Sequence, residues 1–290
     1  MSNRRYGFAG LGQMGGPIAA NIAGGGVPFS VFDKAGTAER APKGATVVDF
    51  LDQLAAETDT LFLSLPDGSV SLAVARELAA MAECAATVVI DLSTIGLEAA
   101  REAGRILKPA GITYIDAPVS GGQSGAKAGT ITVMWAGPKD VLEGHRDVML
   151  SFCKNLFHVG DEPGQGQAMK MLNNFLSGTA MAATSEAVAF GLSQGLDMKT
   201  LLDVVNVSTG RNTATSDKFP NRIFTGTYDA GFKTALLTKD VQLFLDNAKA
   251  AGTPVDVAEA VVNLWRGCNE AFPESDFTRI YEYITGKDKS

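Results

Sequence analysis

One lysine and two adjacent asparagines stand in a stretch that is otherwise typical of a buried helix, "GQGQAMKMLNNF" from Gly164 to Phe175. Lys170 and Asn174 are four residues apart, so they share one face of a helix, and Asn173 borders that face. An asparagine amide can hold a substrate hydroxyl or carbonyl while a lysine moves its proton. Because partial desolvation lowers the pKa of a lysine towards neutrality, this spacing predicts a general acid–base site.

A lysine in a helix more often faces solvent, and this ordinary role is the alternative for Lys170. Two features favour the catalytic role instead. Nearly every neighbour of Lys170 in the stretch is apolar, and the stretch follows directly after a region with the features of a nucleotide-binding domain.

A glycine pattern, Gly10-x-Gly12-x-x-Gly15, follows the first β-rich run and precedes a helix-like segment. Glycines allow a tight turn and close approach of the backbone to a pyrophosphate, and the helix N-terminus adds N–H groups and a positive dipole end. The pattern alone is common, but its position between strand and helix favours a dinucleotide site. We expect the whole turn to bind the cofactor, through Gly10, Leu11, Gly12, Gln13, Met14 and Gly15.

Asp33 ends the second β-rich run, "FSVFD", near the distance of roughly 20 residues at which the dinucleotide fingerprint places an acid. There it would bind both ribose hydroxyls; the alternative is a turn-forming aspartate at a strand end. A carboxylate repels the 2′-phosphate of NADP and so favours NAD as the cofactor. Lys34 and Arg40 could offset that repulsion, which keeps NADP as an alternative.

Three further polar segments follow predicted strands: Leu65-Pro66-Asp67, Ser93-Thr94 and Ser120-Gly121-Gly122. Ligands of open α/β sheets bind at the carboxyl ends of strands. The Ser-Gly-Gly segment offers a hydroxyl and N–H groups that could hold a carboxylate. The structural alternatives are a turn for the first segment, a helix N-cap for the second and a flexible loop for the third.

The elements that must position these residues divide the chain into two parts. Short runs rich in β-branched and aromatic residues alternate with helix-like runs as far as about residue 160, which predicts a mainly parallel sheet with helices on both faces. No strand-like run follows. We therefore predict an α/β Rossmann-type N-terminal domain over 1–162, a long connecting helix over 163–193, and an all-α C-terminal domain over 194–290 for substrate binding and oligomerisation.

Composition excludes several classes of function. The formal net charge of −7 argues against a general binder of nucleic acid or anionic membranes, so an anionic substrate needs a local cationic pocket. Three cysteines (Cys84, Cys153 and Cys268) predict reduced thiols in a cytoplasmic protein rather than a disulfide framework. His145 and His158 are too few for a histidine-rich metal site. We expect neither a signal peptide before the first strand nor a membrane-spanning segment.

Four ordered motifs, the glycine turn, "DAPVSGG", "GQGQAMKMLNN" and "LLTKD", together resemble the β-hydroxyacid dehydrogenases, of the 3-hydroxyisobutyrate dehydrogenase-like type. The resemblance spans nearly the whole chain and implies a Rossmann-type domain followed by a helical domain. It implies that Lys170 is the catalytic lysine. It also implies that the substrate is bound by Ser120, Gly121, Gly122, Asn174, Phe232 and Asp240, and that the cofactor is lined by Leu65, Pro66, Thr94 and Lys239.

Two positions depart from the usual pattern of that family. Trp135 stands where a small or aliphatic residue is common, and the segment Ser208–Pro220 differs from better-known members, so Arg211 and Asn212 could tune substrate choice. Neither difference touches the proposed chemistry.

The resemblance implies reversible hydride transfer between NAD, with NADP as the alternative, and the β-carbon of a short, anionic 3-hydroxy acid. Reduction of small aldehydes, such as glyoxylate, succinic semialdehyde or tartronate semialdehyde, is the nearest alternative. Imine reductases share the architecture but generally lack the lysine, and oxidative decarboxylation of the 6-phosphogluconate type needs a longer C-terminal region. A non-catalytic NAD-binding module is the alternative from another class. We expect a homodimer or homotetramer.

Overall fold

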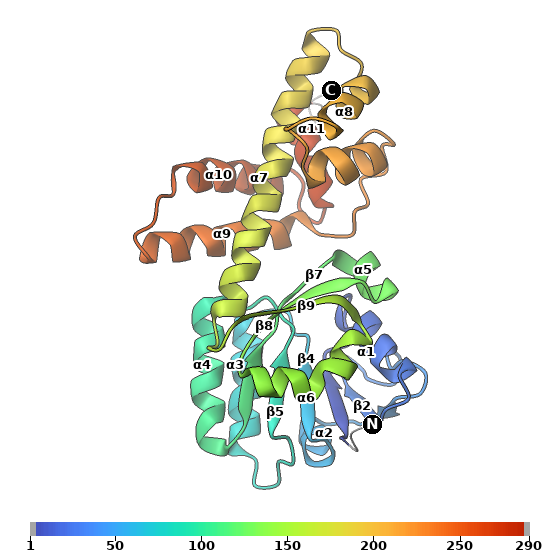
Figure 1. Ribbon diagram of the computed structural model, residues 1–290, viewed down its shortest axis with the longest axis vertical. Helices are drawn as coiled ribbons and strands as arrows, with labels where there is room; N and C mark the ends of the chain where they lie inside the picture. Colours follow the sequence, from blue (N-terminus) through green and yellow to red (C-terminus); the bar gives the residue numbers. More distant parts are fainter. Residues whose placement is uncertain (1–3, 287–290) are drawn as a thin grey trace. The chain divides into compact units, whose positions relative to one another are not determined.

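The computed structural model describes residues 4–286, so the outer ends of the predicted domains 1–162 and 194–290 lie outside the described residues. The chain divides into two compact units, Met1–Lys170 and Met171–Ser290. Helix α7 (Gln165–Ser193) begins in the first unit and continues into the second. Each unit is described separately (Figure 1).

The first unit is built on one sheet whose strands are rich in apolar residues on both faces, as burial beneath helices on two sides requires. Its strands are β1 (Tyr6–Ala9), β2 (Phe29–Phe32), β3 (Thr46–Val47), β4 (Thr60–Leu63), β5 (Val88–Asp91), β6 (Thr113–Asp116), β7 (Val119–Ser120), β8 (Ile131–Ala136) and β9 (Cys153–Gly160). Six of them are parallel in the order β3-β2-β1-β4-β5-β6. This is the strand order of dinucleotide-binding sheets, in which the order along the sheet reverses between β1 and β4.

Strand β8 closes that sheet on its other side. It runs antiparallel to β6 and β7, with Asp116 opposite Ala136, and parallel to β9. The antiparallel pairing turns the chain back after the "DAPVSGG" motif, so this motif stays beside the ends of β5 and β6.

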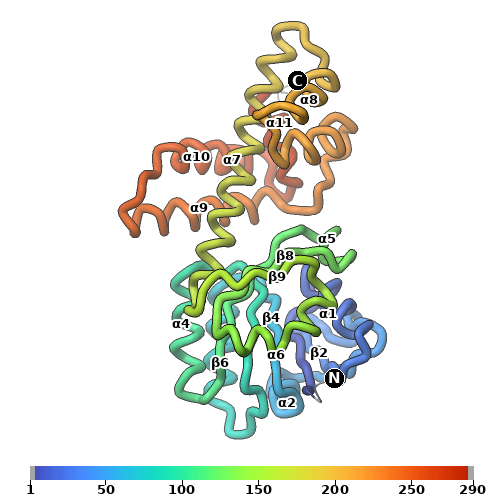
Figure 2. The backbone as a smooth tube through the Cα atoms, viewed as in Figure 1, coloured from blue at the N-terminus to red at the C-terminus, as the bar shows by residue number. Residues whose placement is uncertain are grey.

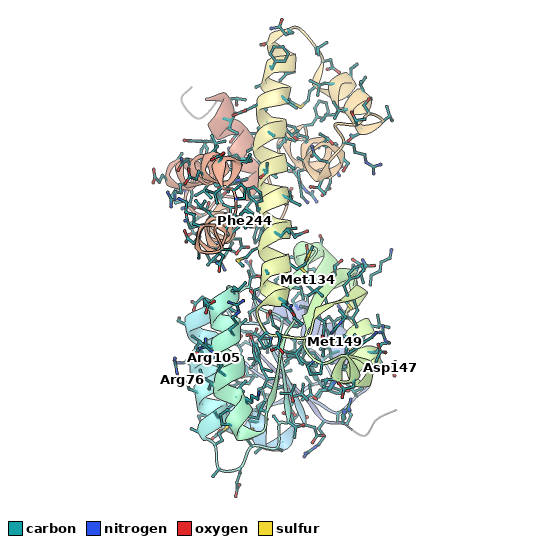
Figure 3. All side chains as sticks on the ribbon, turned by 60° about the vertical axis from the view of Figure 1, so that its left-hand side comes forward. Arg76, Arg105, Met134, Asp147, Met149 and Phe244 are labelled. Atoms are coloured by element: carbon teal, nitrogen blue, oxygen red, sulfur yellow. The ribbon has the colours of Figure 1, made fainter. Side chains whose placement is uncertain are left out.

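Helices cover both faces of the sheet with separate apolar clusters. One cluster is formed with α1 (Gly15–Gly24) and α6 (Lys139–Leu150), and the other with α2 (Leu51–Glu57), α3 (Gly68–Ala80) and α4 (Leu97–Leu107). Arg76 of α3 and Arg105 of α4 point away from the sheet towards solvent (Figure 3). Helices α3 and α4 are therefore apolar inside and charged outside, as is typical of a layered α/β fold.

The second unit is helical. After α7 it contains α8 (Met198–Asn206), the π-helical segment η2 (Ala214–Ile223), α9 (Thr234–Ala250), α10 (Asp256–Ala271), the short η3 (Phe277–Arg279) and α11 (Ile280–Thr285). Helices α9 and α10 lie side by side as a hairpin (Figure 2). Trp265 of α10 is fully buried in the apolar cluster of this unit and donates from Nε1 to the carbonyl of Gly178 in α7. The rings of Phe175 and Phe244 stack with 4.2 Å between their centroids (Phe244 is labelled in Figure 3).

The predicted fold class is confirmed: an α/β Rossmann-type part, a long helix and an all-α part follow one another along the chain. Several elements were not predicted, namely β3, β7, α2, α5 (Gly122–Ala128), α6, η2 and α11. Strands β3 and β7 have two residues each, too few for a periodic pattern. Among residues 4–286, no helix is long and apolar enough to cross a bilayer.

Candidate active site

The glycine turn lies at the point where the strand order reverses, between the carboxyl ends of β1 and β4. Gly10 has φ +96°, and a Cβ on it would lie 2.2 Å from the carbonyl oxygen of Ser64. A Cβ on Gly15 would lie 1.9 Å from the carbonyl oxygen of Gly10. Both contacts are with backbone, so no larger residue fits at either position without moving the main chain.

Gly12, between Gly10 and Gly15, has room for a side chain. Its position is exposed, and a Cβ there would meet no atom within 4 Å. The main chain of the turn therefore borders open space beside the start of α1, whose positive dipole end favours an anion. The turn fits the pyrophosphate of a dinucleotide.

Asp33, just after β2, is bonded to the glycine turn. Its Oδ2 accepts from the N–H of Leu11 at 2.6 Å, and its Oδ1 accepts from the N–H of Ala35 at 2.8 Å. Arg40 Nη1 lies 3.8 Å from Oδ2. A carboxylate oxygen can accept more than one hydrogen bond, so Asp33 retains acceptor capacity for a ribose hydroxyl. Arg40, one of the two basic residues expected to offset the repulsion of a 2′-phosphate, therefore stands next to Asp33.

The segments after β4 and β5 are joined by a side chain. Ser93 Oγ accepts from the N–H of Leu65 at 2.7 Å. Asp67 caps α3 by accepting from the N–H groups of Ser69 and Val70, as the turn alternative supposed. The N-cap alternative for Ser93-Thr94 is wrong, because the residue that precedes α4 is Gly96.

The Ser-Gly-Gly segment is a defined turn. Ser120 ends β7 opposite Thr132, and Gly121 and Gly122 adopt φ +137° and +64° before α5 begins. A Cβ on Gly121 would lie 3.0 Å from the side chain of Ile131. Both glycines are thus required by backbone geometry, and the flexible-loop alternative does not describe this part of the chain.

A buried polar network lies between the ends of β5 and β6 and the first turn of α7. Gln167 is fully buried, and its Nε2 donates to Asp116 Oδ1 at 2.7 Å and to the carbonyl of Ser93 at 3.0 Å. Its Oε1 accepts from the N–H groups of Ile95 at 2.9 Å and Gly96 at 3.1 Å. These four bonds use every donor and acceptor site of the amide.

Two carboxylates in this network are fully enclosed. Burial raises the pKa of Asp116 to about 6, against hydrogen bonds from Gln167 and Gly164 that lower it. Burial likewise raises the pKa of Asp91, which accepts from the N–H of Ser93 and the hydroxyl of Tyr114. Burial, with the nearby carboxylates, also raises the pKa of Tyr114.

Lys170 lies one turn beyond Gln167 on α7 and is the last residue of the first unit. Only 9% of it is exposed. The solvated-face alternative is therefore excluded for this lysine, although its catalytic role stays a prediction.

The second unit holds the other predicted site residues. Asn174 Nδ2 donates to Asp240 Oδ2 at 2.6 Å, and both residues are buried. Lys239 Nζ lies 3.3 Å from Asp240 Oδ1. The backbone of Phe232 donates to Asp276 and accepts from Phe277. Asn174 therefore has its amide nitrogen directed to α9, and its oxygen accepts from Nδ2 of Asn173 at 3.2 Å.

Three residues singled out by the sequence have structural contacts. Trp135 is fully buried in the core of the first unit, on β8, with the ring of His145 at 6.4 Å. Asn212 accepts from the N–H groups of Ala214 and Thr215 and so begins η2. Arg211 is exposed on the preceding turn. Among residues 4–286, no cluster of His, Cys, Asp and Glu could hold a metal ion, and the three cysteines are free.

No sequence pattern predicted the network around Gln167. Asp116 and Gln167 both lie inside motifs that were recognised, "DAPVSGG" and "GQGQAMKMLNN". A signal was present, because Gln167 is three residues before Lys170 and so neighbours it on the helix surface. Its bonding partners, however, are some 50 to 70 residues away in the sequence.

The fold and these contacts define a dinucleotide-binding oxidoreductase of the α/β class. Residues 5–160 match the family described as the NAD binding domain of 6-phosphogluconate dehydrogenase, and residues 164–284 match that described as NAD-binding of NADP-dependent 3-hydroxyisobutyrate dehydrogenase. The 3-hydroxyisobutyrate dehydrogenase of Pseudomonas aeruginosa is 36% identical over 297 residues, with 97% of this chain and 98% of that protein covered.

Two further relatives agree with this. The 2-(hydroxymethyl)glutarate dehydrogenase of Eubacterium barkeri is 34% identical over 267 residues, which cover 91% of this chain and 88% of that protein. The solved structure of Mycobacterium tuberculosis 3-hydroxyisobutyrate dehydrogenase with L-serine has a TM-score of 0.88 at 29% identity, covering 97% of this chain and 99% of that one. The chain belongs to the β-hydroxyacid dehydrogenase family, of the 3-hydroxyisobutyrate dehydrogenase type, and is an NAD(P)-dependent oxidoreductase.

Proposed function

We propose that this enzyme oxidises the primary alcohol of a short 3-hydroxy acid to the semialdehyde, reversibly, with Lys170 as the general acid–base. The observation that carries the proposal is the burial of Lys170 on α7, one turn after a residue bonded to the carboxyl ends of β5 and β6. A buried lysine loses solvation of its charged form, which suits it to proton transfer near neutrality.

The residues of the first unit fit a dinucleotide. The turn Gly10–Gly15 would hold the pyrophosphate, Asp33 the adenosine ribose, and Leu65, Pro66 and Thr94 would line the rest of the cofactor, with Lys239 contributed by α9. Bound nicotinamide supplies or accepts the hydride. We propose NAD as the preferred cofactor, because the Asp33 carboxylate repels a 2′-phosphate. NADP would bind more weakly, because Arg40 beside Asp33 partly offsets that repulsion.

On the substrate side, Ser120, Gly121 and Gly122 would hold the carboxylate. Asn174 would donate to the substrate oxygen through the second hydrogen of its amide nitrogen, whose first hydrogen is bonded to Asp240. During oxidation Lys170 takes the hydroxyl proton, and during reduction it returns a proton to the aldehyde oxygen. Phe232 and Asp240 would complete the binding of the substrate.

The named relatives narrow the substrate class. The compounds 3-hydroxyisobutyrate, 2-(hydroxymethyl)glutarate and L-serine all carry a hydroxymethyl group on the carbon next to a carboxylate. We propose this shared group as the recognised one. The third substituent, which is methyl, carboxyethyl or ammonium in these compounds, is the variable on which substrate choice depends.

A substrate panel tests the proposal. The three hydroxymethyl acids are assayed with NAD and NADP, and their semialdehydes with NADH and NADPH. Glyoxylate, succinic semialdehyde and tartronate semialdehyde are added to the reduction assays to test the small-aldehyde reductase alternative. Lys170→Ala should lose on the order of 10² to 10⁴ in kcat while NADH affinity stays within about twofold. The exposed Lys199, paired with Asp203, provides the control variant Lys199→Ala. Wild-type turnover that Lys170→Ala retains would contradict the assigned role.

We also propose a homo-oligomer located in the cytoplasm. Leu172, Leu176 and Phe190 are exposed along α7 at helical spacing, and an exposed apolar stripe is typical of an interface. Light scattering after chromatography would measure the oligomeric state, and Leu176→Glu should shift it towards monomer.

A further inference from the structure

The side chain of Gln167 joins segments that contribute different parts of the active site. Through Ser93 it is linked to the loop after β4, because the carbonyl of Ser93 accepts from Gln167 and its hydroxyl accepts from the N–H of Leu65. Through Ile95 and Gly96 it binds the start of α4. The segments proposed to line the cofactor and the first turn of α7 are therefore joined by a single amide.

Asp116 completes the attachment from the β6 side. Three donors converge on its carboxylate: the N–H groups of Gly164 and Gln167 at 2.9 and 3.0 Å, and Nε2 of Gln167 at 2.7 Å. The N–H groups at the start of a helix have no partner within the helix, and a buried carboxylate that accepts two of them fixes the position of that start.

Close packing prevents this turn from shifting. A Cβ added to Gly166 would lie 2.6 Å from the carbonyl oxygen of Asp116 and 2.9 Å from that of Met134. The helix therefore touches the main chain of β6 and β8 directly, and Gln167 defines its rotation about its own axis.

We propose that Gln167 is a positioning residue for Lys170, fixing the rotation and depth of the first turn of α7 against the β5 and β6 edges so that the amine meets the reacting hydroxyl. The inference rests on the function proposed above. Gln167 and Lys170 are three residues apart, so any rotation of this turn moves both. A displacement of about 1 Å at a reacting group can lower the rate on the order of 10²-fold.

The first test removes the amide. Gln167→Leu should lower kcat about 10- to 100-fold, with the dissociation constant of NADH changed less than about threefold. The control is Gln165→Leu in the same helical turn, because Gln165 is exposed and its side chain accepts from the N–H of Glu162. It should keep wild-type kcat.

The second test changes the charge at the same position and has a distinct pH signature. In Gln167→Glu, one carboxylate oxygen replaces Nε2 and faces Asp116 at hydrogen-bond distance, so the pair of carboxylates binds a shared proton as the pH falls. The protonated glutamic acid then donates to Asp116 as the amide does. Asp91 on the adjacent strand β5 favours binding of this proton, because its carboxylate raises the pKa of Asp116. Tyr114, on the same strand as Asp116, donates to Asp91, and the Glu98–Arg101 pair of α4 is exposed.

The kcat of Gln167→Glu relative to wild type should therefore rise at least about fivefold between pH 8 and pH 5.5, whereas the ratio for Gln167→Leu stays flat. A merely structural loss would lower the melting temperature of both variants without this difference. If Gln167→Leu does not fold, the pH signature of Gln167→Glu still decides. A flat ratio for Gln167→Glu, or wild-type kcat for Gln167→Leu, would overturn the inference.

Failure of the proposed function gives a different result. In that case no hydroxymethyl acid is oxidised by the wild type, or turnover survives in Lys170→Ala. When turnover depends on Lys170 but not on Gln167, the proposed function stands and the positioning role is wrong.

Discussion

At the ends of β1 and β2 the first unit presents mostly main chain, whereas at the ends of β5 and β6 it presents buried side chains. The glycine turn borders open space at Gly12, and its main chain donates to the carboxylate of Asp33 through the N–H of Leu11. The β5–β6 edge instead encloses Asp91, Asp116 and Gln167, all fully buried. Both are parts of one carboxyl edge of one sheet.

The difference follows from what each part must hold. A turn that receives a large anionic ligand works best with exposed N–H groups and no side chains in the way. An edge that fixes the helix carrying a proton-transfer group needs directional bonds on every side. Open main chain thus serves for binding, and a saturated side-chain network serves for positioning.

The largest effect should come from adding a single methyl group to the glycine turn. In Gly15→Ala the new Cβ would lie 1.9 Å from the carbonyl oxygen of Gly10, so the main chain must move. We expect a loss of at least about 3 kcal/mol in the free energy of unfolding, measured by urea denaturation.

Gly12→Ala separates binding from stability, because a Cβ there meets no protein atom within 4 Å. Its unfolding free energy should stay within about 0.5 kcal/mol of wild type, while NADH affinity falls about tenfold or more in a fluorescence titration. Gly24→Ala, at the end of α1 and also without contacts, should change neither quantity. Equal stability of Gly15→Ala and Gly24→Ala would refute the close-approach argument.

The next largest effect on stability concerns Asp116, at the carboxyl end of β6. Asp116→Asn leaves one acceptor oxygen for three converging donors and turns an amide nitrogen towards them. We expect a loss of about 2 kcal/mol at pH 7, since an unsatisfied buried donor costs about 1 to 3 kcal/mol. Asp59→Asn, at an exposed pair with Arg5, should cost less than about 1 kcal/mol.

The same variant has a pH signature. Burial raises the pKa of Asp116 from 3.8 to about 6, so the native state binds a proton more tightly than the unfolded state between these values. The wild-type free energy of unfolding should therefore fall as the pH rises from about 4 to about 6, by at most about 3 kcal/mol from this group. Asp116→Asn lacks this contribution, so its deficit is largest near pH 4. A deficit independent of pH would contradict the burial argument.

Tryptophan fluorescence can assign these losses to a unit. The chain has two tryptophans, Trp135 in the core of the first unit and Trp265 in the core of the second, both fully buried. In a Trp265→Phe background, the remaining signal reports on the sheet in which Asp116 lies.

The contrast between the glycine turn and the ends of β5 and β6 also explains what the sequence could predict. The glycine turn, Asp33 and the alternation of strands and helices are local patterns, because each depends on residues within one strand-turn-helix unit. Lys170 was recognisable since its neighbours within one helix are apolar. Resemblance to a known family supplied the roles of distant residues such as Asp240.

The network could not be predicted in the same way. Gln167 is bonded to Ser93, Ile95, Gly96 and Asp116, which only the strand order brings together. No periodicity marks such a residue, since one buried amide leaves the apolar pattern of a helix almost unchanged. The two-residue strand β7 and the hydrogen bonds of Asn212 to the start of η2 were not predicted for a similar reason, because bonding partners rather than propensity define them.

The smallest predicted effect returns to the open edge and concerns cofactor choice. Asp33→Ser removes the carboxylate and leaves Arg40, which lies 3.8 Å from it, available for a 2′-phosphate. The ratio of kcat/KM for NADP over NAD should rise about 10- to 30-fold, which corresponds to about 1.4 to 2 kcal/mol. Adding Arg40→Ala to the Asp33→Ser variant should reverse most of that gain in the ratio. Adding Lys34→Ala to the same variant instead measures how much Lys34 contributes to NADP binding. If Asp33→Ser leaves the ratio unchanged, Asp33 acts only as the hydrogen-bond acceptor of the N–H groups of Leu11 and Ala35. Selection between the cofactors then depends on other residues.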